Sequence, residues 1–330
     1  MSTQCRATLT LQPLRGIFFM GAVLLLNAAC SINPKLELAE LSSGQAPVRL
    51  SGVPFYPQLE FQCGPAALAG ALGAASVETR PEELAPQVYL PARQGSLQVE
   101  LLAATRRAGR IAYVPPPEPA ALIAQLEAGR PVLVLQNLRT PHFPVWHYAL
   151  LVGFDPVANQ FVLNSGEQQG LQISAGRFMR TWDWADRWAM VVLEPGALPA
   201  EPDLQRLLEA VAAFEAVAGA DAALPSWRAL AARWPGEPRS HLALGNAAYA
   251  RQELQRAVAH YRNGLRLEPG DPALNNNLAS VLGELGCGQA AAALLQPVAA
   301  GLPADSQWQG IITETLAELN RSTPPALHCR

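Results

Sequence analysis

The 330-residue chain carries little charge: 15% of its residues are Asp, Glu, Lys or Arg, and the net charge is −3. A protein that binds nucleic acid presents a strongly basic surface, which this composition does not supply. Half of the residues are hydrophobic (50%), a fraction that favours well-packed globular domains. We therefore expect about two well-packed globular domains and no nucleic-acid partner.

Several motifs of cofactor and metal chemistry are missing. The sequence has no Cys-x-x-Cys pair and no His-x-x-x-His pair, the spacings that recur in zinc sites. It also has no Gly-x-x-x-x-Gly-Lys loop of the kind that cradles nucleotide phosphates. The expectation is a protein without a metal, without a cofactor and without an ATPase activity of its own.

No hydrophobic run is long enough to cross a bilayer as a helix. The longest, Gly16–Leu26, follows Arg6 and Arg15 and has the form of a secretory signal peptide. It ends in Asn-Ala-Ala followed by Cys30, and small residues before a cysteine resemble the cleavage site of bacterial lipoproteins.

That resemblance implies a signal peptide at residues 1–29, lipidation of Cys30 and a linker at residues 30–47. Ser31 would then direct the protein to the outer membrane, facing the periplasm, with the lipid as its membrane anchor. The alternative is an ordinary signal peptide followed by an incidental cysteine.

Once Cys30 and the signal peptide are accounted for, three cysteines remain: Cys63, Cys287 and Cys329. An odd number of thiols in an oxidising compartment leaves at least one unpaired. Cys63 fits the role of the free thiol. Cys287 and Cys329 can pair with each other.

Cys63 lies where a glutamine-bearing segment gives way to the alanine-rich run Gly64–Leu68, which predicts a cysteine at a helix N-terminus. The unpaired N–H groups and the dipole there favour a thiolate, the nucleophilic form of cysteine. Gln58 or Gln62 can then place a side-chain amide at a developing oxyanion. The alternative for a lone cysteine is a small apolar residue at the start of a buried helix.

His147 begins a continuous apolar run that predicts a buried strand, and a second strand follows from Gln160 to Leu163 and ends at Asn164. A histidine and an asparagine so placed can lie side by side. The Asn164 oxygen would accept the Nδ1–H of His147 and leave the other ring nitrogen for the thiol. Asp155 is a rival for the orienting role, and His142 is a rival base.

Between these segments the pattern predicts short helices and strands. Ser96 is the expected N-cap of the second helix. The expected helices are Pro81–Ala85, Gln98–Ala108 and Pro119–Ala128, and the expected strands are Ile111–Val114 and Val132–Gln136.

The Cys-Gly-Pro-Ala-Ala-Leu and His-Tyr-x-Leu-Leu-Val-Gly-Phe-Asp motifs resemble the papain-like peptidase domain of bacteriocin-exporting ABC transporters, which removes double-glycine leaders, and its stand-alone relatives. The resemblance implies an α+β papain-like domain at residues 48–195, with a helical lobe and an antiparallel sheet. It also implies the catalytic residues Cys63, His147, Asn164 and Gln58.

A proline-rich linker at residues 196–203 precedes an Ala- and Leu-rich half in which Pro235, Pro269 and Pro303 recur at intervals of 34 residues. Small residues keep the same register, as in tetratricopeptide repeats. The resemblance implies an all-α domain over 204–330. Its expected parts are repeats at about 204–237, 238–271 and 272–305 and a capping helix at 306–320. Such stacked hairpins usually bind a protein partner.

Together these features predict a membrane-anchored cysteine peptidase in the bacterial cell envelope that acts on peptide or protein substrates. One alternative is a catalytically inactive scaffold lipoprotein that recruits a partner protein. The other is an amide transferase that uses the same Cys-His-Asn chemistry.

Overall fold

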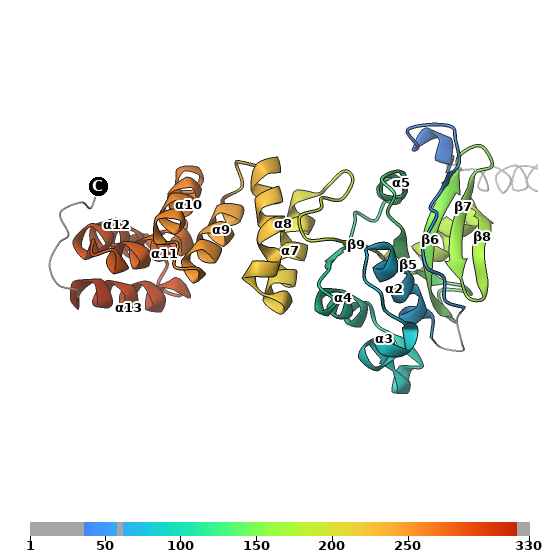
Figure 1. The fold of residues 1–330 in the computed structure, drawn as a ribbon, viewed down its shortest axis with the longest axis horizontal. Coiled ribbons are helices and arrows are strands. Elements are labelled where there is room, and N and C mark those ends of the chain that lie inside the picture. Colours follow the sequence, from blue (N-terminus) through green and yellow to red (C-terminus); the bar gives the residue numbers. More distant parts are fainter. Residues whose placement is uncertain (1–35, 58–61, 322–330) are drawn as a thin grey trace, which may run out of the picture. The chain divides into compact units, whose positions relative to one another are not determined.

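A computed structural model describes residues 36–57 and 62–321 (Figure 1). The predictions for the signal peptide, for Cys30 and Gln58, and for Cys329 lie outside the described residues. All helices and strands below belong to one compact unit, Leu38–Arg330.

The first half of this unit is built on one seven-stranded sheet in which every neighbouring pair is antiparallel. The strand order is β4-β9-β5-β6-β7-β8, and β1 pairs with β6. Most of β5, β6, β7 and β9 is buried. Helix α2 contacts all four strands, and α5 or α6 also contacts β5, β6 and β7. The strands of the sheet are β1 (Val48–Arg49), β4 (Ile111–Tyr113), β5 (Val132–Asn137), β6 (Trp146–Asp155), β7 (Gln160–Ser165), β8 (Gln168–Ser174) and β9 (Ala189–Leu193).

Helix α2 (Cys63–Ala74) packs against one face of the sheet and is buried from Gly64 through Leu72. Its Ala- and Gly-rich sequence permits this close approach. A Cβ on Gly70 would lie 2.8 Å from the Pro54 carbonyl oxygen and 3.0 Å from Leu150 Cδ2. Leu150 therefore belongs to the face of β6 that α2 covers.

Helix α6 (Ala175–Asp183) covers another part of the sheet. It begins after Ser174, whose Oγ accepts the Arg177 N–H as an N-cap. Phe178 of α6 is fully buried, with its ring centroid 4.4 Å from that of Phe161 on β7. This aromatic contact fixes α6 to the sheet.

The remaining short elements agree with the sequence pattern to within a few residues at their ends. Ser96 is an exception: the residue before α4 is Leu97, and Ser96 lies instead in the two-stranded hairpin β2–β3. The elements are α3 (Pro81–Val88), β2 (Tyr89–Leu90), β3 (Gly95–Ser96), α4 (Gln98–Arg107) and α5 (Pro119–Glu127).

The second half of the unit is all-helical, and its helices form successive antiparallel hairpins. Small residues allow the helices to approach: a Cβ on Gly245 would lie 2.3 Å from the Tyr261 ring, and one on Gly264 would lie 2.7 Å from Leu274. The helices are α7 (Leu204–Ala218), α8 (Ala220–Arg233), α9 (Pro238–Ala250), α10 (Leu254–Leu267), α11 (Pro272–Glu284), α12 (Gly288–Gly301) and α13 (Trp308–Arg321).

The joint between the halves is hydrogen-bonded to the sheet-containing half. The Gln125 amide on α5 both donates to and accepts from the backbone of Ala200, at 2.8 and 3.3 Å. The Asp203 N–H donates to the Tyr113 hydroxyl at 3.2 Å. These residues therefore have fixed backbone partners.

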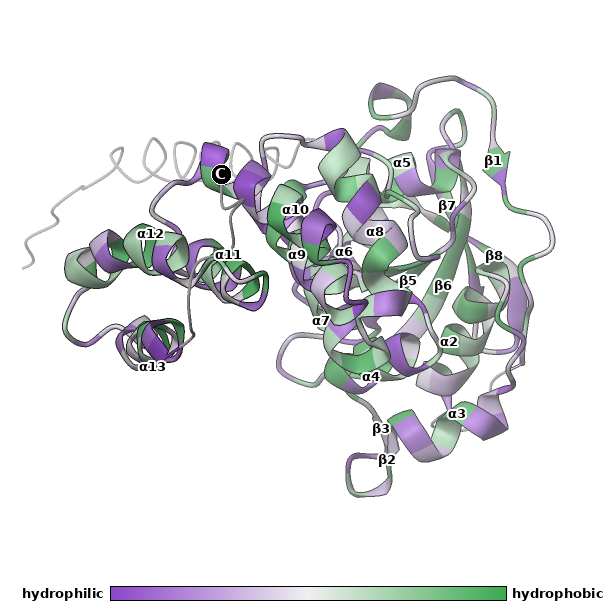
Figure 2. Ribbon diagram, turned by 60° about the vertical axis from the view of Figure 1, so that its left-hand side comes forward, coloured by the Kyte–Doolittle hydropathy of each residue, from purple (hydrophilic) through white to green (hydrophobic). Residues whose placement is uncertain are grey.

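The chain thus has an α+β part with an antiparallel sheet followed by an all-α part, which confirms the predicted fold class. Figure 2 shows the hydrophobic residues concentrated along β5 and β6, where α2 packs. Among the helices of residues 36–57 and 62–321, none combines the length and the hydropathy needed to cross a membrane.

Candidate active site

Helix α2 begins at Cys63, which confirms the predicted helix N-terminus. Cys63 is a half-buried free thiol. Burial raises its pKa above the ordinary value, and the backbone N–H groups of Tyr148, Gly64 and Cys63 oppose this only in part. The sequence favoured a thiolate. In the structure desolvation outweighs the helix N-terminus, and the thiol is protonated at neutral pH.

Tyr148, whose backbone N–H faces the Cys63 sulfur, is the residue that follows His147 in β6. The start of α2 and the start of β6, far apart in sequence, are therefore brought together at the backbone of Tyr148. Within the described residues no hydrogen bond joins the Cys63 sulfur to the His147 ring, which lies on the other face of β6 from the Tyr148 side chain. Burial and the nearby Cys63 both raise the pKa of the Tyr148 hydroxyl, so this side chain stays neutral and donates to the Ser96 carbonyl oxygen at 3.3 Å.

His147 is the second residue of β6 and lies opposite Gln136 of β5. Its Nε2 is 2.9 Å from Ser165 Oγ at the end of β7. Burial lowers the pKa of the imidazole, so His147 is neutral at pH 7. A neutral imidazole has one nitrogen free to accept a proton, which is the form a general base requires.

Asn164 is placed differently from the sequence expectation. It lies opposite Leu150, and its Oδ1 accepts the Gly170 N–H at 3.1 Å. Side chains alternate between the faces of a strand, so Asn164 shares the face of Leu150, whereas His147 belongs to the opposite face. Ser165, one residue further along β7, is the residue whose hydroxyl is hydrogen-bonded to the imidazole. The bonded ring nitrogen is Nε2, whereas the expected one was Nδ1.

The two rivals have other positions. Asp155 lies at the far end of β6, where its Oδ1 accepts the N–H groups of Val157 and Ala158 at 3.0 and 2.8 Å and closes the turn to β7. His142 is exposed in the loop between β5 and β6. Within the described part of the chain, neither side chain forms a hydrogen bond with Cys63 or His147.

Sequence reasoning missed two serines. Ser165 follows the strand end predicted at Asn164, and regular alternation from the β6–β7 turn would place Asn164, not Ser165, on the face of His147; the register shift between Leu151 and Gly153 exchanges the two. Ser96 lies against the first turn of α2: a Cβ on Gly64 would be 2.3 Å from its Oγ, which is buried and without a hydrogen-bond partner. No local pattern indicates that contact, because it joins two distant segments.

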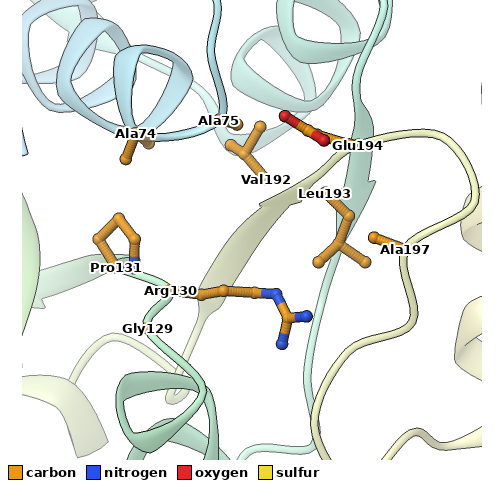
Figure 3. A pocket seen from close by; sticks show the side chains of 10 residues that line it. Ala74, Ala75, Gly129, Arg130, Pro131, Val192, Leu193, Glu194 and Ala197 are labelled. Carbon is orange, nitrogen blue, oxygen red and sulfur yellow. The ribbon is translucent and has the colours of Figure 1, made fainter.

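A pocket of about 200 Å³ lies at the other end of α2, beside Ala74 and Ala75 (Figure 3). Arg130 and Glu194 supply its charged groups. Cys63 begins α2 and Ala74 ends it, so this pocket is remote from the thiol. Within residues 36–57 and 62–321 no group of three His, Cys, Asp or Glu side chains is placed to hold a metal ion.

Residues 50–185 match the model of a family described as the Peptidase_C39 like family. Among solved structures, a Bacillus anthracis protein classed as a C39-like peptidase aligns with a TM-score of 0.37 at 17% identity, covering 45% of this chain and 98% of that chain. No curated protein matches the chain.

Two further structures align with TM-scores of 0.33 and 0.29. The first is the type III secretion translocator chaperone SycD of Yersinia enterocolitica, at 19% identity, with 36% of this chain and 91% of that chain covered. The second is MamA, at 12% identity, with 36% of this chain and 78% of that chain covered.

The family match spans Cys63, His147 and Ser165, so the α+β part of the chain is similar to a papain-like peptidase domain.

Proposed function

We propose that this protein is a cysteine peptidase in which Cys63 is the nucleophile and His147 the general base. The observation that carries the proposal is the contact of the Cys63 sulfur with the backbone N–H of Tyr148, the residue that follows His147. The His147 ring is neutral and bonded to Ser165 on the other face of β6, so the proposed proton transfer requires the ring to turn toward the thiol at the end of the strand. The match of residues 50–185 to the C39-like family supports the same reaction class.

The protonation states favour a mechanism in which the proton leaves the thiol as the sulfur attacks. His147 takes the Cys63 proton while the sulfur bonds to the scissile carbonyl carbon, and the carbonyl oxygen becomes an oxyanion. The Cys63 backbone N–H and the Gln58 amide are the proposed donors to that oxyanion. The imidazolium then protonates the leaving amine, the C–N bond breaks, and water hydrolyses the thioester with His147 again as base.

Ser165 takes the positioning role in this proposal. A hydroxyl that is hydrogen-bonded to Nε2 holds the ring and leaves Nδ1 for the thiol proton. A serine is a weaker partner for an imidazolium than a carboxylate, because it carries no charge. Asn164 supports the turn between β7 and β8 through its bond to Gly170.

A thiol-directed activity probe tests the assignment. A peptidyl probe with a thiol-reactive end group is expected to label the wild type near neutral pH, to fail with Cys63→Ala, and to react much more slowly with His147→Ala. His142→Ala is the matched control, because this exposed histidine is expected to leave labelling unchanged. Equal labelling of the wild type and His147→Ala would refute the pair.

The location and the partner are also proposals. Lipidation of Cys30 would anchor the chain to the outer membrane facing the periplasm. Labelled palmitate that is incorporated into the wild type but not into Cys30→Ala would support this.

The tandem hairpins α7–α12 are proposed to be tetratricopeptide-like repeats that bind a protein. A cavity of about 260 Å³ beside Leu208, Trp227 and Asn246 supports a binding role there.

One observation favours the second candidate, an inactive scaffold: the raised pKa of Cys63 leaves little thiolate at pH 7. The probe experiment separates the two, because a scaffold would show the same low reactivity in the wild type and in His147→Ala. In a true catalytic pair the imidazole accelerates the reaction of the thiol.

A further inference from the structure

The hairpin between β5 and β6 exposes an unusual set of apolar side chains. Leu138, Phe143, Val145 and Trp146 are 51%, 72%, 42% and 53% exposed. The other large apolar residues that are exposed in the described ranges are aliphatic and widely spaced: Val99, Val157, Val217, Leu267, Leu294 and Ile311. We call residues 138–146 the apolar hairpin.

The apolar hairpin is held in one conformation by Asn137, which is fully buried. The Asn137 Nδ2 donates to the Thr140 carbonyl oxygen at 2.9 Å, and its Oδ1 accepts the Val145 N–H at 3.0 Å. The Phe143 N–H donates to Thr140 Oγ1 at 3.2 Å. A loop that presents apolar side chains from a hydrogen-bonded frame has already lost the conformational entropy that binding would otherwise cost.

The hairpin is continuous with the candidate active site. Trp146 is the first residue of β6 and directly precedes His147, and the buried Asn137 is the cross-strand partner of Trp146. In the proposed reaction His147 protonates the leaving amine. The part of the substrate C-terminal to the scissile bond therefore lies on the histidine side, which is the side of the apolar hairpin.

We propose that the apolar hairpin binds apolar side chains of the substrate on the C-terminal side of the scissile bond. The choice of side rests on the proposed function. The occupant is a segment of polypeptide substrate, because the patch adjoins the base and carries a single formal charge, that of Arg139. A site of this kind would select substrates by the residues that follow the cleaved bond.

Direct binding tests the inference without requiring catalysis. The protein is the Cys63→Ala variant of the full chain. The probes are the fluorescein-labelled peptide Ala-Ser-Gly-Gly-Leu-Leu-Ser-Lys and the same peptide with Ser-Ser in place of Leu-Leu. The leucine peptide is expected to bind roughly tenfold more tightly than the serine peptide, the factor expected when one or two apolar side chains leave water.

Adding Phe143→Ser or Trp146→Ser should reduce that preference to about twofold or less. Val157→Ser is the matched control, because Val157 is equally exposed (75%) but lies in the turn at the far end of β6. It should retain the full preference. All three replaced side chains are exposed, and thermal unfolding is expected to be unchanged.

Three results would overturn the inference. The first is equal binding of the leucine and serine peptides, and the second is a preference for the leucine peptide that survives in both hairpin variants. The third is binding of the wild type to phosphatidylcholine vesicles that the hairpin variants lose, although they keep the peptide preference. The last result would identify a membrane-contacting loop. A failure of the proposed function gives a different result: the activity probe does not label Cys63, but the protein still prefers the leucine peptide.

Discussion

His147 Nε2 lies 2.9 Å from Ser165 Oγ, so the residue that holds the imidazole is the one after the asparagine that the sequence indicated. The two side chains meet because they share a face of adjacent antiparallel strands. Asn164, on the other face, bonds to the Gly170 N–H instead.

Substitutions at the two neighbouring positions should therefore have different effects. Ser165→Ala is expected to lower kcat about tenfold with little change in thermal stability, because it frees the imidazole ring. Asn164→Ala should cost about 1–2 kcal/mol of unfolding free energy, because it removes the acceptor of a turn N–H. Kinetics on a peptide substrate and urea unfolding measure the two effects. The reverse pattern, with a large kcat loss in Asn164→Ala alone, would return the orienting role to the asparagine.

The reactivity of Cys63 should depend on pH in a way that follows from burial. Its pKa is raised, so the thiolate fraction is small at pH 7 and increases as the pH rises toward and past 9. Alkylation by iodoacetamide, followed by mass spectrometry, should accelerate throughout that range without a plateau near neutrality. A plateau below pH 7 would show a preformed thiolate–imidazolium pair.

Protonation of His147 is expected to set the acid limb of the pH profile of kcat/KM. Burial lowers its pKa below the ordinary value of about 6.5, so the neutral base persists at pH 7 and is protonated only at more acid pH. The acid limb of kcat/KM for peptide cleavage is therefore expected below pH 6.5. An acid limb above that pH would contradict the buried, neutral imidazole.

Gly64 directly follows Cys63, the proposed nucleophile, and has no room for a side chain. A Cβ there would lie 2.3 Å from Ser96 Oγ and 2.7 Å from Ser96 Cβ. Gly64→Ala is expected to cost about 1–3 kcal/mol of unfolding free energy and to reduce Cys63 labelling. The double variant Gly64→Ala with Ser96→Gly should recover most of both losses. Failure of the second change to rescue the first would mean that the clash lies elsewhere.

A similar pair tests the packing of the helical half. Gly245→Ala should destabilise the all-α part by about 1–3 kcal/mol, because its Cβ would lie 2.3 Å from the Tyr261 ring. Gly310→Ala is the control: this glycine in α13 has no atom within 4 Å of the added Cβ, and the change should stabilise by about 0.5–1 kcal/mol. Thermal unfolding measured by circular dichroism separates the two outcomes.

The sequence predicted what depends on periodicity and on local chemistry. The start of α2 at Cys63, the hairpin after His147 and the helical hairpins of the second half follow from apolar runs, turn residues and the 34-residue recurrence of proline. These features are encoded within a few tens of residues, and the structure departs from them by one or two residues at element ends.

The geometry and protonation of the candidate site depend on strand register and on burial, which no local sequence pattern contains. The partner of His147 was displaced by one residue because the register of β6 on β7 shifts between Leu151 and Gly153. A shift of one residue reverses the face on which every later side chain lies. The protonation of Cys63 depends on how deeply the start of α2 is buried by the sheet, which is a tertiary property.

The two hydrogen bonds between Gln125 and Ala200 bear on how the first domain would be produced alone. A fragment ended at residue 195, ahead of the proline-rich stretch, would leave the buried Gln125 amide without either bond, at a cost of about 1–3 kcal/mol. It would also remove the backbone N–H that reaches Tyr113. A truncation intended to preserve the peptidase domain should therefore keep the chain through Asp203.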